Sequence, residues 1–237
     1  MIRKPTAGLF ISGTGTEIGK TRVASVIIRA LARGGKRVGV YKPAASGCQV
    51  VDGQVTSDDA LALWSAAGGV GNIHDVCPQR FVPALAPHLA ARAEGKEIDR
   101  ELLFDGLAAN MEGQDVVVVE GAGGLFSPTS DRDLSVDLTL AFGLPVVVVA
   151  ANRLGMVHET LATLLAARGY GGQGPPIAGV VVNHPAPRGG DASLETNIAE
   201  LGRWLDVPLL ATLAHGADAF DREVDWFAVA SRTARGP

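Results

Sequence analysis

The sequence contains little cysteine and few aromatic residues, with two cysteines and an aromatic content of 5%. Cys48 and Cys77 lack the spacing of metal ligands, so free thiols of a cytoplasmic protein are the simplest interpretation. No apolar run approaches the length that spans a membrane, and residues 7–11 are too short for a signal peptide. The net charge of −4 disfavours nucleic-acid or membrane partners. We therefore expect a cytoplasmic protein with neither kind of partner.

Apolar residues and glycine are abundant, at 47% of the chain and 30 residues respectively. Continuous apolar runs predict strands over 7–11, 37–41, 116–119, 145–150, 177–182 and 207–213. Helix-patterned stretches lie between them, over 20–32, 58–67, 100–111, 134–141, 157–168 and 194–205. Strands that alternate with helices indicate an α/β fold, in which helices cover both faces of a parallel sheet. We expect residues 1–237 to form one domain.

The stretch from Gly13 to Thr21 predicts a phosphate-binding loop, because it joins the first strand to the first helix and ends in Gly-Lys-Thr. Backbone N–H groups and the helix start would cradle phosphate, Lys20 would reach the outer phosphates, and the Thr21 hydroxyl would face Mg²⁺. The usual spacing requires glycine at position 14, where this chain has Thr14. The loop is therefore one residue longer, and it places Thr16 and Glu17 at its crest.

Polar side chains follow several of the predicted strands at the point where each strand ends. These residues are Lys42 with Ser46, Glu120 and Asn183. Because ligands bind beyond the carboxyl ends of parallel strands, we expect these side chains and the phosphate loop to share one edge of the sheet.

Lys42 is one of five lysines in a chain with sixteen arginines, so a lysine at a strand end is interpreted as a cation for developing negative charge rather than as a surface residue. Glu120 ends a run of four valines, and a charge there needs a partner. Mg²⁺ is the partner that we favour over a structural ion pair. Ser46 is open to interpretation as a simple turn residue.

With these residues assembled, the sequence resembles the dethiobiotin synthetase family. The family's extended loop, G-T-x-T-E-x-G-K-T, is matched from Gly13 to Thr21, and its K-P-x-x-[ST]-G is matched from Lys42 to Gly47. Its V-E-G-A-G-G is matched from Val119 to Gly124, and Ala86-Pro87-His88 is similar to its S-P-H. Order and spacing agree over residues 7–127 and more loosely as far as Asn183.

The resemblance implies an ATP- and Mg²⁺-dependent ligase of biotin biosynthesis, which closes a ureido ring on 7,8-diaminopelargonate with CO₂. It implies catalytic roles for Lys20 and Lys42. Metal contacts would come from Thr21, Asp59 and Glu120, although the residues alone leave Asp58 as a competitor of Asp59. ATP contacts would come from Glu17, Ile18, Gly19, Lys20, Thr21, Asp59, Glu120, Gly121, Ala122, Gly123 and Asn183, and substrate contacts from Thr16, Lys42, Ser46, Pro87, Gly155, Met156 and His158.

In the family, the helix start near Gly155 comes from a partner subunit and receives the substrate's carboxylate tail, so the resemblance implies a homodimer. This chain departs from the family's Leu-Gly-x-x-Asn-His, because His158 and Glu159 follow Met156 and Val157. The late base-contacting segment also differs, falling on Ala214-His215-Gly216.

Two other functions share the predicted fold. A partition or septum-site switch ATPase would normally carry a lysine four positions before Gly19, where this chain has Gly15. A relative of the cobyrinate diamide synthases would carry a further glutaminase domain, for which the chain has no room.

Overall fold

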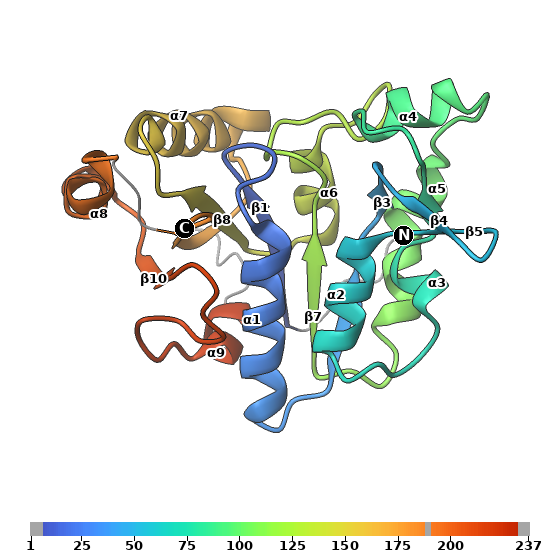
Figure 1. The fold of residues 1–237 in the computed structure, drawn as a ribbon, viewed down its shortest axis with the longest axis horizontal. Helices are drawn as coiled ribbons and strands as arrows, with labels where there is room; N and C mark the ends of the chain where they lie inside the picture. Colours follow the sequence, from blue (N-terminus) through green and yellow to red (C-terminus); the bar gives the residue numbers. More distant parts are fainter. Residues whose placement is uncertain (1–6, 188–190, 232–237) are drawn as a thin grey trace.

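The computed structural model describes residues 7–187 and 191–231, and its centre is a parallel sheet of six strands (Figure 1). The strand order is β10-β9-β8-β1-β7-β2. Their bounds are β1 Gly8–Gly13, β2 Val38–Tyr41, β7 Val116–Glu120, β8 Val146–Ala151, β9 Ile177–Asn183 and β10 Leu209–Leu213. All six predicted strands form this sheet, and the predicted fold class is confirmed.

Successive strand residues point to opposite faces of the sheet, and each face packs against its own set of helices. One face packs against α1 (Lys20–Arg33), α2 (Asp58–Ala66) and α9 (Trp226–Ala230). The other packs against α5 (Arg100–Asp105), the 3₁₀ helix η1 (Gly106–Asn110), α6 (Ser135–Phe142), α7 (Met156–Gly169) and α8 (Ser193–Trp204). Burial on both faces explains why the strands are uninterrupted valine-rich runs.

Several short elements outside the sheet were not predicted. They are β3 (Ala44–Ala45) paired with β6 (Gln79–Arg80), the β4–β5 hairpin (Gln49–Val51 and Gln54–Thr56), α3 (Ile73–Val76), α4 (Pro87–Ala93) and the 3₁₀ turn η2 (Tyr170–Gly172). The predicted helix over 100–111 is divided at Gly106, where any Cβ would lie 2.4 Å from the Tyr41 hydroxyl oxygen. No helix within the described ranges is long and apolar enough to cross a membrane.

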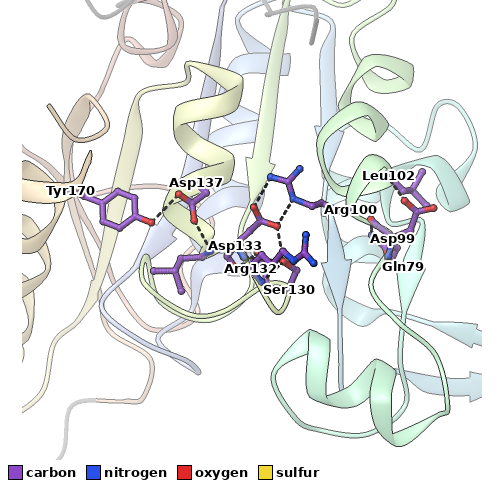
Figure 2. A network of polar contacts seen from close by, with 11 residues as sticks. Gln79, Asp99, Arg100, Leu102, Ser130, Arg132, Asp133, Asp137 and Tyr170 are labelled. Carbon is purple, nitrogen blue, oxygen red and sulfur yellow. Dashed lines mark hydrogen bonds and ion pairs between the residues drawn. The ribbon is translucent and has the colours of Figure 1, made fainter. Parts of the chain in front are cut away.

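A polar network fixes the segment before α6 (Figure 2). The Arg100 guanidinium donates to both carboxylate oxygens of Asp133, at 2.8 and 2.9 Å, and the Ser130 hydroxyl donates to the same carboxylate at 2.6 Å. Asp137 accepts from the backbone N–H of Leu134 at 2.7 Å and from the Tyr170 hydroxyl at 2.9 Å. These contacts connect α5, the start of α6 and η2, which directly follows α7.

Candidate active site

The phosphate loop leads from the end of β1 into α1, and two of its residues have positive φ angles, Glu17 (57°) and Gly19 (86°). A Cβ at Gly19 would lie 2.1 Å from the Asn183 amide nitrogen, so only glycine fits there. That nitrogen donates to the Ile18 carbonyl at 2.9 Å and ties the end of β9 to the loop. The Lys20 ammonium donates to the Gly15 carbonyl at 2.8 Å, within the loop itself.

Lys42, Asp59, Glu120 and Thr21 meet at the carboxyl edge of the sheet. The buried Lys42 ammonium donates to Glu120 at 2.6 Å and to Asp59 at 2.7 Å. The Thr21 hydroxyl lies 2.8 Å from the other Asp59 oxygen and 2.9 Å from Glu120. A hydroxyl carries one proton, so it can donate to only one of these carboxylates at a time.

Burial and ion pairing act in opposite directions on these groups. Burial raises the pKa of Glu120 above its usual value, against the opposing effect of Lys42. Burial alone would lower the pKa of Lys42, but the Glu120 and Asp59 carboxylates raise it above its usual value. Burial alone would raise the pKa of Asp59, but the Lys42 charge and hydrogen bonds from Lys42 and Thr21 lower it below its usual value. Lys42 therefore remains a cation and Asp59 an anion at neutral pH. Lys20 has no such direct ion pair, and burial lowers its pKa.

The cluster suits Mg²⁺. Glu120 Oε2 is buried and has no hydrogen-bond partner, and a hard cation would satisfy it. Among the described residues, no group of three or more His, Cys, Asp or Glu side chains could hold a metal. Mg²⁺ commonly uses one or two carboxylates together with a hydroxyl and substrate phosphates, and Asp59, Glu120 and Thr21 provide that set. Asp58 points elsewhere and accepts from the Gln49 amide at 3.0 Å.

These residues line a cavity of about 830 Å³. Most of the predicted site residues are in its wall, namely Thr16, Glu17, Gly19, Lys20, Thr21, Lys42, Ser46, Asp59, Pro87, Glu120, Ala122 and Gly123. Sequence reasoning missed a further set, Ala45, Gly47, Ala84, Leu85, Ala86 and Ser127. Ala45, Ala84, Leu85 and Ala86 add apolar surface to a wall that otherwise carries charge. The Ser127 hydroxyl accepts from the Gly124 N–H at 2.8 Å and so shapes the turn after β7.

Other predicted residues do not line the cavity. The Ile18 side chain is buried in the core, and a Cβ at Gly121 would lie 2.5 Å from Ser135 Oγ, so Gly121 serves close packing. Asn183 lies behind the loop, as described above. Met156 is fully buried in α7, whereas Gly155 and His158 are exposed at the start of that helix. The Glu159 carboxylate there is held by Arg153, at 2.8 and 3.1 Å.

Comparison with known proteins adds to this geometry. A sequence profile described as an AAA domain matches residues 7–219. An ATP-dependent dethiobiotin synthetase from Rhodopirellula baltica is 44% identical over 215 residues, which are 86% of this chain and 82% of that protein. The chain belongs to the dethiobiotin synthetase family. A second family member, from Anaeromyxobacter dehalogenans, is 42% identical over 206 residues, covering 87% of this chain and 89% of the relative.

Solved structures place this family member among the phosphate-loop folds. A ParA family ATPase from Chlorobium tepidum covers 90% of this chain and 86% of its own, with a TM-score of 0.53 and 15% identity. A chain of the MinC:MinD cell division protein complex of Aquifex aeolicus gives a TM-score of 0.52 at 14% identity, covering 88% of this chain and 81% of that chain. Such low identity shows the fold alone. The dethiobiotin synthetase relatives, not these ATPases, therefore indicate the function.

Proposed function

We propose that this chain is an ATP-dependent ligase that converts 7,8-diaminopelargonate and CO₂ into dethiobiotin, with release of ADP and phosphate. The observation that carries the proposal is a cavity in which a phosphate loop, a buried lysine and a carboxylate–hydroxyl cluster face an apolar wall. A cationic end suits phosphoryl transfer, and an apolar wall suits an aliphatic diamine. Septum-site and cobyrinate-type functions are not favoured, because the dethiobiotin synthetase relatives align over most of their length.

The reaction needs positioning and charge neutralisation rather than a protein nucleophile. One substrate amine adds to CO₂ and loses a proton, which gives a carbamate. A carbamate oxygen then attacks the γ-phosphorus, and the bond from that phosphorus to ADP breaks. The second amine attacks the carbamoyl carbon of the mixed anhydride, phosphate leaves, and the ureido ring closes. Lys20 and Lys42 would flank the transferring phosphoryl group and offset its negative charge.

We assign the remaining contacts in the same way. Thr21, Asp59 and Glu120 would hold Mg²⁺, which neutralises phosphate charge when it is bound. Thr16, Ser46 and Pro87 would contact the diamine and carbamate, while Gly19, Ala122 and Gly123 would let the backbone approach phosphate. Asn183 would read the purine through its amide oxygen, while one of its two amide N–H groups holds the Ile18 carbonyl. Backbone donors from Gly155 to His158 of a second subunit would bind the carboxylate tail, which requires a homodimer. We assign the enzyme to the cytoplasm.

The test is phosphate release from ATP, measured with 7,8-diaminopelargonate and bicarbonate added separately and together. We expect release only when both are present, with formation of an equal amount of dethiobiotin. Turnover that depends on glutamine, or on a membrane or partner protein, would contradict the proposal and favour one of the other two functions.

A further inference from the structure

A second cavity, of about 430 Å³, lies in the groove between α1 and α2, which run side by side (Figure 1). Its lining consists of Thr21, Arg22, Ser25, Arg29, Ala62, Ser65 and Ala66. Of the described lining residues, Thr21 alone is shared with the active site, and the Thr21 hydroxyl faces the Asp59–Glu120 cluster. The small residues of α2 leave this groove open beside the longer side chains of α1.

Within the part of the chain that the structure describes, two polar groups that line the groove have no hydrogen-bond partner. Ser25 is 5% exposed, and its hydroxyl is buried without a donor or acceptor. Arg29 Nη2 is also buried without a hydrogen-bond partner, and its ion-pair contact with Asp218 Oδ1, at 3.9 Å, is too long for a hydrogen bond. Buried polar groups are normally satisfied, so an orphan hydroxyl beside an orphan guanidinium nitrogen indicates a missing partner.

The charge around the groove favours an anion as that partner. Positions 22, 25 and 29 lie on one face of α1, because they are spaced by three and four residues. No acidic residue is among the described residues that line the groove. Arg22 is already occupied, since it donates to the carbonyls of Gly216 and Ala217 at 3.1 and 2.6 Å and pairs with Asp218. Arg29 has only a longer ion-pair contact, of 3.9 Å, with the same Asp218 carboxylate. Among the described residues that line the groove, Arg29 is therefore the cation less engaged by the protein.

We propose that this groove is a second binding site, which holds a phosphate group through Arg29 and Ser25. The Arg29 guanidinium would donate to phosphate oxygens from its planar fork, and the Ser25 hydroxyl would add a further donor. The volume falls in the range of small-molecule sites, roughly 300–1,000 Å³, so the groove has room for a small phosphomonoester as well as for free phosphate. The site goes beyond the ligase reaction, which takes place in the other cavity.

Isothermal titration calorimetry tests this site in the presence of saturating Mg²⁺ and a non-hydrolysable ATP analogue, which fills the phosphate loop. Inorganic phosphate and glycerol 3-phosphate are titrated separately, so that the free ion and the ester are distinguished. We expect saturable one-to-one binding of at least one of them. Arg29→Gln should weaken it about tenfold or more, and Ser25→Ala should weaken it by a smaller factor.

Arg33→Gln is the matched control, because Arg33 is an exposed arginine in the last turn of the same helix. It should bind phosphate as the unmodified protein does. Arg29→Lys, which keeps the charge but loses the fork, should recover part of the affinity. Circular dichroism establishes that each variant is folded. Absence of saturable binding, or a folded Arg29→Gln variant that binds as tightly as the unmodified protein, would overturn the proposal.

Discussion

At the scale of single residues, Lys42 acts as the counter-ion of two carboxylates. Its ammonium is buried between Asp59 and Glu120, which are also the proposed ligands of Mg²⁺. Two positive charges cannot share these oxygens without repulsion. Binding of metal and ATP should therefore move Lys42 from the carboxylates toward the phosphate, which is where the proposed reaction needs it.

Lys42→Gln should nearly abolish turnover and also destabilise the metal-free protein. Removal of one partner from a buried ion pair costs about 3–5 kcal/mol, because the other charge is left without compensation. Mg²⁺ should recover part of that loss by neutralising Glu120. Urea unfolding with EDTA or with Mg²⁺ measures both effects, and Lys36→Ala, remote from the cavity, is the lysine control. Normal turnover by folded Lys42→Gln would return Lys42 to a purely structural role.

Asp58 and Asp59 are adjacent but should behave differently. Asp59→Asn removes a charge from the proposed Mg²⁺ site and should raise the Mg²⁺ concentration that gives half-maximal activity. Asp58→Asn should leave it unchanged, because the Asp58 carboxylate contacts Gln49 outside the cavity. A Mg²⁺ titration of turnover in the two variants gives the comparison. If both curves match that of the unmodified protein, Asp59 is not a metal ligand.

At the scale of elements, the Asp133 network holds the start of α6 against α5 (Figure 2). Burial alone would raise the pKa of Asp133, but hydrogen bonds from Arg100 and Ser130 outweigh burial and hold it below the usual value of 3.8. The folded state therefore favours the ionised carboxylate. The resulting stabilisation is complete above the unfolded-state pKa and is lost as pH falls through the lower folded-state value.

Asp133→Asn should accordingly reduce the free energy of unfolding at pH 7 by about 1–3 kcal/mol, the usual cost of breaking a hydrogen bond to a charged group. The difference from the unmodified protein should shrink as the pH falls below 3.8. Urea unfolding at several pH values measures it, with Asp131→Asn as the exposed control. A difference that stays constant down to acid pH would show that charge is not its source.

The start of α7 has backbone N–H groups. In the proposed dimer they would bind the carboxylate tail of the substrate held by the other subunit. His158 is exposed there, and Arg153 neutralises the nearby Glu159. His158→Ala should raise the KM for the diamine modestly, because the imidazole would lie beside the bound carboxylate tail. The KM for ATP should not change. Steady-state kinetics give both values, and an unchanged KM for the diamine would remove His158 from the site.

At the scale of the whole molecule, α7, α8 and the loop before α7 expose large apolar side chains. Leu154 is 76% exposed, Leu165 64% and Trp204 63%. We predict that the proposed homodimer covers these side chains. The solution mass should be twice the 24.4 kDa of one chain. Leu165→Glu should reduce the solution mass to that of a monomer and lower turnover. Light scattering measures the mass, and phosphate release measures the turnover. A fully active monomer would refute a shared site.

Much of this molecule could be predicted from its sequence, because the central strands are buried on both faces and their valine runs have no other simple interpretation. The positions of Lys42 and Glu120 followed from the strands that they end, by the rule that parallel strands gather ligands at one edge. That rule does not choose between Asp58 and Asp59. The choice depends on the first turn of α2, which Ser57 caps by accepting from the Ala60 N–H.

Other features lay beyond the reach of sequence patterns. Leu85 and Ser127 line the cavity from loops, where no periodicity reveals a direction. The strands of the β4–β5 hairpin have only three residues each, which is too short for a clear alternating pattern. Its Asp52-Gly53 turn, with φ angles of 50° and 76°, is the one sequence signal that indicates a hairpin here. The polar atoms of Ser25 and Arg29 that lack a hydrogen-bond partner are buried by the packing of α2 against α1. The sequence of α1 alone does not predict that packing.

The contact between Asn183 and Ile18 has a consequence for inhibitor design. One amide supports the phosphate loop with its nitrogen and, in our assignment, faces the purine with its oxygen. A compound that pushes Asn183 aside to enlarge the base site must therefore also release the Ile18 carbonyl and loosen the loop. The affinity that such a compound gains at the base site would be offset by weaker binding of its triphosphate mimic to the loop. Inhibitors that leave Asn183 in place, and extend instead along the apolar wall at Leu85, avoid that conflict.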